Sequence, residues 1–126
     1  MNYMIMMFGC ASLEAASRTP EWLAGMGDLM HGLEAELREA GELVASVGLV
    51  DPDRASTVRL DGGVPVTTDG PFAEVKESLA GYWLIDADEA RAVEIASRVV
   101  AYVGHPMEVR RVMHEGAPAE ASAPGT

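Results

Sequence analysis

The sequence is short of cysteine and of basic residues, and each shortage excludes a class of protein. Cys10 is the single cysteine among 126 residues, which excludes an intrachain disulfide and any metal site built from several thiolates. Nine Lys and Arg residues are outnumbered by 20 Asp and Glu residues, for a net charge of −11. Phosphate backbones are bound by clustered cations, so we expect no nucleic-acid partner. The three histidines lack ligand spacing, and we expect neither a metal nor a cofactor.

Long apolar runs are missing as well. The run MIMMF at 4–8 is too short for a signal peptide and has no basic residue before it. No run approaches the length that crosses a bilayer. We therefore expect a cytoplasmic protein with no membrane contact. The length and the 48% hydrophobic content are typical of one globular domain.

The first part of the chain predicts a strand, a helix and a second strand. The apolar run YMIMMFG at 3–9 predicts a buried strand. Thr19 and Pro20 predict a helix start, with Thr19 as the cap, and Gly41 suits the helix end. Residues 43–49 predict the second strand. The helix carries an apolar stripe made of Trp22, Met26, Leu29, Met30, Leu33 and Leu37.

The second part predicts a hairpin followed by strand, helix and strand. Residues 56–60 and 64–67 flank Gly62 and Gly63, a link typical of hairpins, and Pro65 predicts that this hairpin lies at a sheet edge. Strands are expected at 79–85 and 107–113. Asp86 and Glu89 suggest a capping box at the start of a helix that lies between these two strands. Its predicted inner face consists of Ala90, Val93, Ala96, Ser97 and Val100.

This order of elements predicts an α+β fold, the ferredoxin-like α/β plait, with an inserted β-hairpin. The domain is expected to span residues 1–114, and the tail at 115–126, which lacks large apolar groups, is expected to be disordered. The strands at 3–9 and 79–85 are apolar throughout, which indicates that both faces of the sheet are buried. A homodimer that pairs sheet against sheet would bury the second face and create a cleft between subunits.

Two stretches of this chain resemble a known family. TDGPFAEVKE at 68–77 and GYWLID at 81–86 are similar to the DGPF-domain proteins of the YCII-related family. Further matches are Ala40–Gly41, Glu89–Ala90 and the segment 108–110, so that the resemblance extends from Tyr3 to Val112. It implies a bacterial protein with a ferredoxin-like plait, usually a dimer, whose function is largely uncharacterised. Some YCII relatives resemble small lyases or dehydrochlorinases with a proposed histidine–aspartate dyad.

Two residues are candidates for proton transfer. Asp69 could act as a general base if it is partly removed from water, or it could cap its own turn by accepting backbone N–H groups. His31 lies on the helix where YCII relatives place their histidine, but the matching position holds Met30. On a helical wheel His31 lies about 180° from Trp22, so it faces solvent or works in an intersubunit cleft.

Six residues are candidates for binding a substrate: Arg59, Phe72, Lys76, Tyr82, Trp83 and Arg110. Lys76 or Arg59 would hold an anionic group, although Lys76 also fits a solvated charged surface. Tyr82 and Trp83 are strand neighbours, so one faces the helices and the other faces the cleft or a partner. Arg110 shares a strand face with Glu108, as an ion pair or as a ligand clamp.

Two functions of different classes fit these residues. The first is a cofactor-free small-molecule enzyme that transfers a proton, as a lyase or isomerase does, in an intersubunit cleft with Asp69 as acid and base. The second is a non-catalytic module that binds a small ligand or a protein. The resemblance suggests a sigma factor as that protein, because DGPF-domain proteins are often encoded beside extracytoplasmic-function sigma factors.

Overall fold

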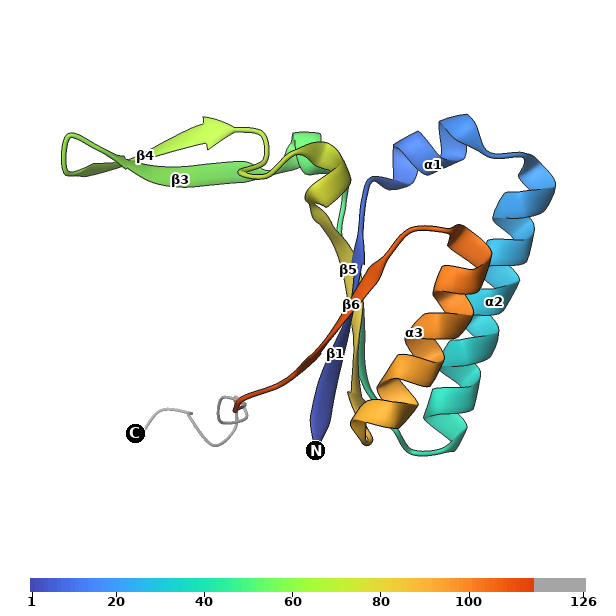
Figure 1. The fold of residues 1–126 in the computed structure, drawn as a ribbon. Helices are drawn as coiled ribbons and strands as arrows, with labels where there is room; N and C mark the ends of the chain where they lie inside the picture. The colour runs from blue at the N-terminus through green and yellow to red at the C-terminus, as the bar shows by residue number, and fades with distance from the viewer. Residues whose placement is uncertain (115–126) are drawn as a thin grey trace.

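The computed structural model describes residues 1–114 (Figure 1). Six strands and three helices follow in the order β1 (Asn2–Phe8), α1 (Ala11–Ser17), α2 (Pro20–Glu39), β2 (Leu43–Gly48), β3 (Ser56–Asp61), β4 (Val64–Asp69), β5 (Leu79–Asp86), α3 (Glu89–Val103) and β6 (Met107–Arg111). Short 3-10 turns lie at 52–54 and 75–77. The tail that was expected to be disordered lies outside the described residues.

Four of the strands form one antiparallel sheet in the order β2-β5-β1-β6. Helices α2 and α3 pack side by side on one face of it (Figure 1). This is an α+β arrangement, and its strand order is compatible with the ferredoxin-like fold. Ile5 lies opposite Trp83 on one side and Val109 on the other, so the sheet presents a row of apolar side chains to the helices.

The core lies between this face of the sheet and the two helices. Ile5, Trp83 and Ile85 from the central strands are fully buried against Leu33 and Leu37 of α2 and against Ile95 and Val99 of α3. Burying a side chain of this size contributes about 1.5–3 kcal/mol. The core explains why the two central strands tolerate so few polar residues on the helix side.

Helix α2 begins and ends as its sequence predicts. Thr19 is the cap, and its Oγ1 accepts a hydrogen bond from the Trp22 backbone N–H at 3.1 Å, while Pro20 occupies the first helical position. After the last turn Gly41 takes a positive φ of 72°, which glycine adopts without a steric penalty. Leu33 and Leu37 of the predicted stripe are buried.

Helix α3 differs from its prediction in both its cap and its buried face. The cap is Asp88, whose carboxylate accepts from the Arg91 N–H at 2.8 Å, whereas Asp86 ends β5 and pairs with the N-terminal amine at 2.8 Å. The buried face consists of Ala92, Ile95, Ala96 and Val99. The predicted residues Ala90, Val93 and Ser97 are exposed. The larger side chains Ile95 and Val99 bury more apolar area, so they determine which face turns inward.

Helix α1 and the placement of the β3–β4 pair also differ from expectation. No helix was predicted at 11–17, because a single short helix shows no sustained apolar period. Strands β3 and β4 turn at Gly62 and Gly63, both with positive φ, but they form a separate two-stranded sheet and do not extend the edge of the main sheet. Hydrogen bonds between residues 55–57 and Gly70 close the base of this pair and direct it away.

The indole of Trp83 is buried, so its N–H requires a partner within the protein. Glu34 of α2 accepts that hydrogen bond at 2.8 Å and a second one from the Ser46 hydroxyl at 2.5 Å. These hydrogen bonds, from Ser46 and from Trp83, hold the pKa of Glu34 below its ordinary value despite partial burial. One carboxylate therefore joins α2 to β2 and to the central strand β5.

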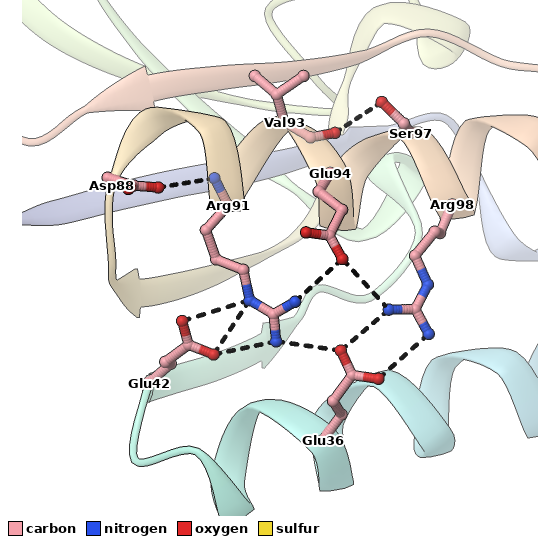
Figure 2. Close-up of polar contacts among 8 residues, drawn as sticks. All are labelled: Glu36, Glu42, Asp88, Arg91, Val93, Glu94, Ser97 and Arg98. Atoms are coloured by element: carbon pink, nitrogen blue, oxygen red, sulfur yellow. Dashed lines mark hydrogen bonds and ion pairs between the residues drawn. The ribbon is translucent and has the colours of Figure 1, made fainter.

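Arg91 lies at the centre of an ionic network that joins α3 to the end of α2 (Figure 2). Its guanidinium pairs with Glu42 and Glu36 at 3.0 Å each and with Glu94 at 3.1 Å. Arg98 adds a second link to Glu36 at 2.9 Å. Hydrogen bonding to Glu42 raises the pKa of Arg91 above its ordinary value, against the effect of burial. The network fixes α3 along α2 on the solvent side of the core.

We predict that Glu34→Ala lowers the free energy of unfolding by about 1–3 kcal/mol, because it leaves a buried indole N–H without an acceptor. Urea denaturation followed by tryptophan fluorescence measures the change. Glu39→Ala, on the exposed end of the same helix, is the control and should change stability by less than about 0.5 kcal/mol. An equal, small effect of both substitutions would show that the Glu34–Trp83 bond contributes nothing.

Candidate functional site

A pocket of about 970 Å³ lies at the end of the sheet where β1 leads into α1. Four segments line it: the end of β1, one side of α1, the 3-10 turn at 75–77 and the connection from α3 to β6. Phe8, Leu13, Pro106 and Met107 supply apolar surface. The polar lining consists of Cys10, Glu14, Ser17, Arg18, Lys76, Glu77, His105 and Glu108. A volume of this size is in the range that binds small molecules.

The local backbone brings α1 to the pocket. Gly9 has a positive φ of 130° and donates its N–H to the Ser78 carbonyl at 2.9 Å, which ends β1 beside the turn at 75–77. The Cys10 carbonyl then accepts from the Glu14 N–H at 3.2 Å and starts α1. Because Glu14 and Arg18 are four residues apart on this helix, their side chains lie on the same side of it.

Arg18 is held in place by three contacts. Its Nε donates to Glu14 Oε2 at 3.0 Å, and its Nη2 donates to the Val103 carbonyl at 3.2 Å. The guanidinium carbon also lies 4.2 Å from the centre of the Trp22 ring, a cation–π contact. Arg18 thereby connects α1 with α2 and with the end of α3.

His105 contacts the second oxygen of the same carboxylate, so that Glu14 lies between a histidine and an arginine. Its Nε2 is hydrogen-bonded to Glu14 Oε1. Burial favours the neutral acid, but the hydrogen bonds from Arg18 and His105 outweigh it and lower the pKa of Glu14. An ionised carboxylate only accepts hydrogen bonds, so the proton lies on Nε2 of the imidazole. In the neutral form of this imidazole, the other ring nitrogen, Nδ1, carries a lone pair.

Cys10 takes part in a second polar cluster beside the pocket. Its Sγ lies 3.2 Å from Ser12 Oγ. Hydrogen bonds from the side chains of Ser12 and Cys10 lower the pKa of Asp51, which lies just before the turn at 52–54. These contacts fasten the start of α1 to the segment that follows β2.

The two predicted acid–base residues lie apart from this pocket. Asp69 is exposed at the end of β4, and within residues 1–114 its carboxylate accepts no hydrogen bond, from its own backbone or elsewhere. His31 is exposed on α2. The β3–β4 pair and α2 lie on opposite sides of the main sheet, so the structure does not bring these two side chains together (Figure 1).

Of the six predicted binding residues, Lys76 is the one that lines the pocket. Trp83 faces the helices and is 1% exposed, and Tyr82 therefore points to the opposite face of the sheet. Arg110 forms an ion pair with Glu108 at 2.5 Å. Arg59 is exposed on β3, and Phe72, which follows β4, is 88% exposed.

Glu14, Arg18 and His105 were missed as site residues. The spacing of Glu14 and Arg18 is a signal for a helical ion pair, but it is informative only once a helix is expected at 11–17. The contact of His105 with Glu14 joins residues 91 positions apart, and no local pattern predicts it.

In residues 1–114 no three His, Cys, Asp or Glu side chains are grouped so as to hold a metal ion. No helix in this part of the chain has both the length and the apolarity needed to cross a membrane.

We predict that Glu14→Gln lowers the melting temperature most above pH about 4.5 and progressively less below it. A carboxyl whose folded-state pKa is lowered stabilises the fold when ionised, and this contribution disappears as the pH falls through the folded-state value. Near pH 7 the loss should be about 1 kcal/mol, or about 4 °C. Thermal unfolding at pH 7 and pH 3 measures it, and Glu39→Gln is the exposed control. A difference that is the same at both pH values would contradict the prediction.

Comparison with known proteins identifies the family. The YCII-related domain matches residues 1–115. Uncharacterized protein R00369 of Rhizobium meliloti (strain 1021) is 37% identical over 93 residues, which cover 71% of this chain and 74% of that protein. The family match at 1–115 includes both helices of the core, the sheet and the pocket described above. The chain therefore belongs to the YCII-related family.

Proposed function

We propose that this protein is a small-molecule enzyme that transfers a proton in the pocket at the end of the sheet. The observation that carries the proposal is the hydrogen bond between His105 and Glu14, with Arg18 on the other carboxylate oxygen. A histidine whose second nitrogen is held by an ionised carboxylate is a common arrangement of a general base. Here the pair lies on the wall of a pocket large enough for a substrate.

The proposed step needs no group beyond the substrate and these side chains. His105 Nδ1 takes a proton from a carbon next to a carbonyl, and the electron pair of the broken C–H bond stays on the substrate as an enolate. Glu14 stabilises the imidazolium that forms, because its carboxylate is already ionised and hydrogen-bonded to Nε2. Return of the proton at another atom gives isomerisation, and loss of a leaving group from the adjacent carbon gives elimination.

The remaining pocket walls fit a small molecule with an apolar part and an anionic group. Phe8, Leu13 and Met107 come from three different elements and offer apolar surface. The Lys76 ammonium makes no hydrogen bond or ion pair with the described residues, so its charge is available to a substrate carboxylate or enolate.

We predict that the protein accelerates exchange of C–H protons for solvent deuterium, and that His105→Gln slows this exchange about 10²–10⁴-fold. Proton NMR in D₂O on a panel of cyclic ketones and 2-oxo acids measures the rates. Circular dichroism checks that the variant is folded. Glu14→Gln should also slow exchange, but less, because it leaves the base in place.

Matched variants at the two other acid–base candidates separate the assignments. His31→Gln and Asp69→Asn change the same kinds of side chain outside the pocket, and we expect wild-type exchange rates from both. Loss of exchange in Asp69→Asn alone would transfer the role to Asp69. Binding of a panel compound without any exchange would replace the proposal with the non-catalytic binding module.

We also propose that the protein is a homodimer in which the main sheets face each other. The face without helices, which we call the open face, carries Met4, Met6, Ala45, Val47, Tyr82 and Leu84. All six are buried or half-buried within one chain, and the charged pair Glu108–Arg110 at the edge is neutral as a pair. Phe8, at the end of β1, and Glu108, on β6, both line the pocket, so a second copy would border the pocket. The pocket would then be an intersubunit cleft.

We predict that the wild type is a dimer at a protein concentration of about 10 µM, as expected of a specific interface. Leu84→Glu should dissociate this dimer. This substitution places a charge in the middle of the open face, and the charge would have to be desolvated when two copies associate. Light scattering after gel filtration measures the mass. Val93→Glu, at an exposed position of α3, is the control and should remain dimeric. A wild type that is monomeric under these conditions would contradict the dimer and its cleft.

A further inference from the structure

We call the β3–β4 pair (residues 56–69) the arm. It exposes several large apolar side chains that its two strands do not bury. Val58 is 66% exposed, Leu60 is 73% exposed and Val64 is 59% exposed. The arm is a sheet of only two strands. An isolated hairpin of this kind is at best marginally stable in water, and exposed valine and leucine in a row indicate a surface that contacts something else.

The arm is anchored at its base, so its direction is determined. Thr57 is buried, and its Oγ1 donates to the Gly70 carbonyl at 2.7 Å. The Gly70 N–H donates to the Ala55 carbonyl at 2.8 Å. These hydrogen bonds hold the two ends of the arm together where it leaves the body of the protein. The exposed apolar residues therefore extend from a fixed point.

The two faces of the arm differ in polarity. The pairing of Val58 with Thr67 and of Leu60 with Pro65 puts these four residues on one face, because alternate residues of a strand point the same way. The pair of Ser56 and Asp69 lies on the same face, at the base of the arm. The other face carries Arg59, Asp61, Val64, Val66 and Thr68. Its two charges favour contact with water. Beyond Asp69 at the base, the Val58–Leu60 face carries no charge, so it is the face suited to contact with protein.

The arm extends on the same side of the sheet as the open face. In Figure 1 it leaves the body to the left, whereas α2 and α3 cover the right-hand side. A partner that covers the open face therefore approaches from the side on which the arm projects. One partner would cover both apolar surfaces.

The distribution of charge favours a second copy as that partner. The chain has a net charge of −11, so two copies repel each other over most of their surfaces. The arm, however, holds one arginine and two aspartates, a net charge of −1, and the charges of Glu108 and Arg110 on the open face cancel. Two copies meet with the least repulsion on this side. In a dimer with twofold symmetry, both arms and both open faces would be covered at once.

We propose that the Val58–Leu60 face of the arm packs against the second copy of the chain and extends the dimer interface beyond the open face. This inference rests on the dimer proposed above, but the two can fail separately. The arm also leads through Gly70 to the turn at 75–77, which holds Lys76 in the pocket wall. Docking of the arm would thus fix one wall of the pocket in each subunit.

The test compares one substitution on the two faces of the arm. Val58→Asp and Val64→Asp replace the same residue at similar exposure in paired strands, so they change strand propensity and net charge equally. Sedimentation velocity over a range of concentrations gives the dimer dissociation constant of each. We expect Val58→Asp to raise this constant at least tenfold and Val64→Asp to change it less than threefold. Because Val58 is exposed in the single chain, its substitution should leave the melting temperature of the monomer unchanged.

Three results would overturn the inference. A wild-type protein that is monomeric would remove the second copy as the partner. Equal weakening by the two substitutions would show a general effect of charge without a docked face. A wild-type dimer that Leu84→Glu dissociates and Val58→Asp leaves intact would retain the sheet-to-sheet dimer and reject the arm contact.

Discussion

The architecture depends on burying one tryptophan in the central strand of the sheet. Trp83 is the largest fully buried side chain, and it lies under both helices. An indole in this position contributes a large apolar area, but its N–H would be costly without an acceptor. Glu34 meets this need from α2, and the same carboxylate also receives the Ser46 hydroxyl. One partly buried carboxylate at the margin of the apolar core thereby connects α2 with β2 and β5.

The ends of the helices are fixed by different means. At one end Arg91 joins α3 to Glu36 and Glu42 through charge-assisted hydrogen bonds. At the other end Arg18 joins α1 to Trp22 and to the Val103 carbonyl. The second of these ends carries the pocket, where Glu14 is shared between Arg18 and His105. The contacts that hold the framework together at this end also position the proposed base, so structural and chemical roles meet in the same carboxylate.

Sequence patterns predicted the elements of the fold well, whereas among the predicted site residues Lys76 is the one that lines the pocket. The cap at Thr19, the positive φ of Gly41 and the alternation of Tyr82 and Trp83 follow from rules that act over a few residues. The buried face of α3 was predicted wrongly, because small and large apolar residues surround that helix and packing selects among them. The pair of Glu14 and His105 comes from opposite ends of the chain, beyond the reach of any local rule.

The sequence by itself determined the α+β arrangement, the absence of an intrachain disulfide, the acidic net charge and the YCII-related family, because these follow from composition and from short-range pattern. It also marked the turn around Asp69 and Gly70 as distinctive. Only the tertiary structure decided where that turn lies. It ends an arm on the helix-free side of the sheet, while the pocket forms where α1, the turn at 75–77 and the α3–β6 connection converge. That convergence depends on long-range strand pairing and helix packing, which bring together side chains that are far apart in the sequence.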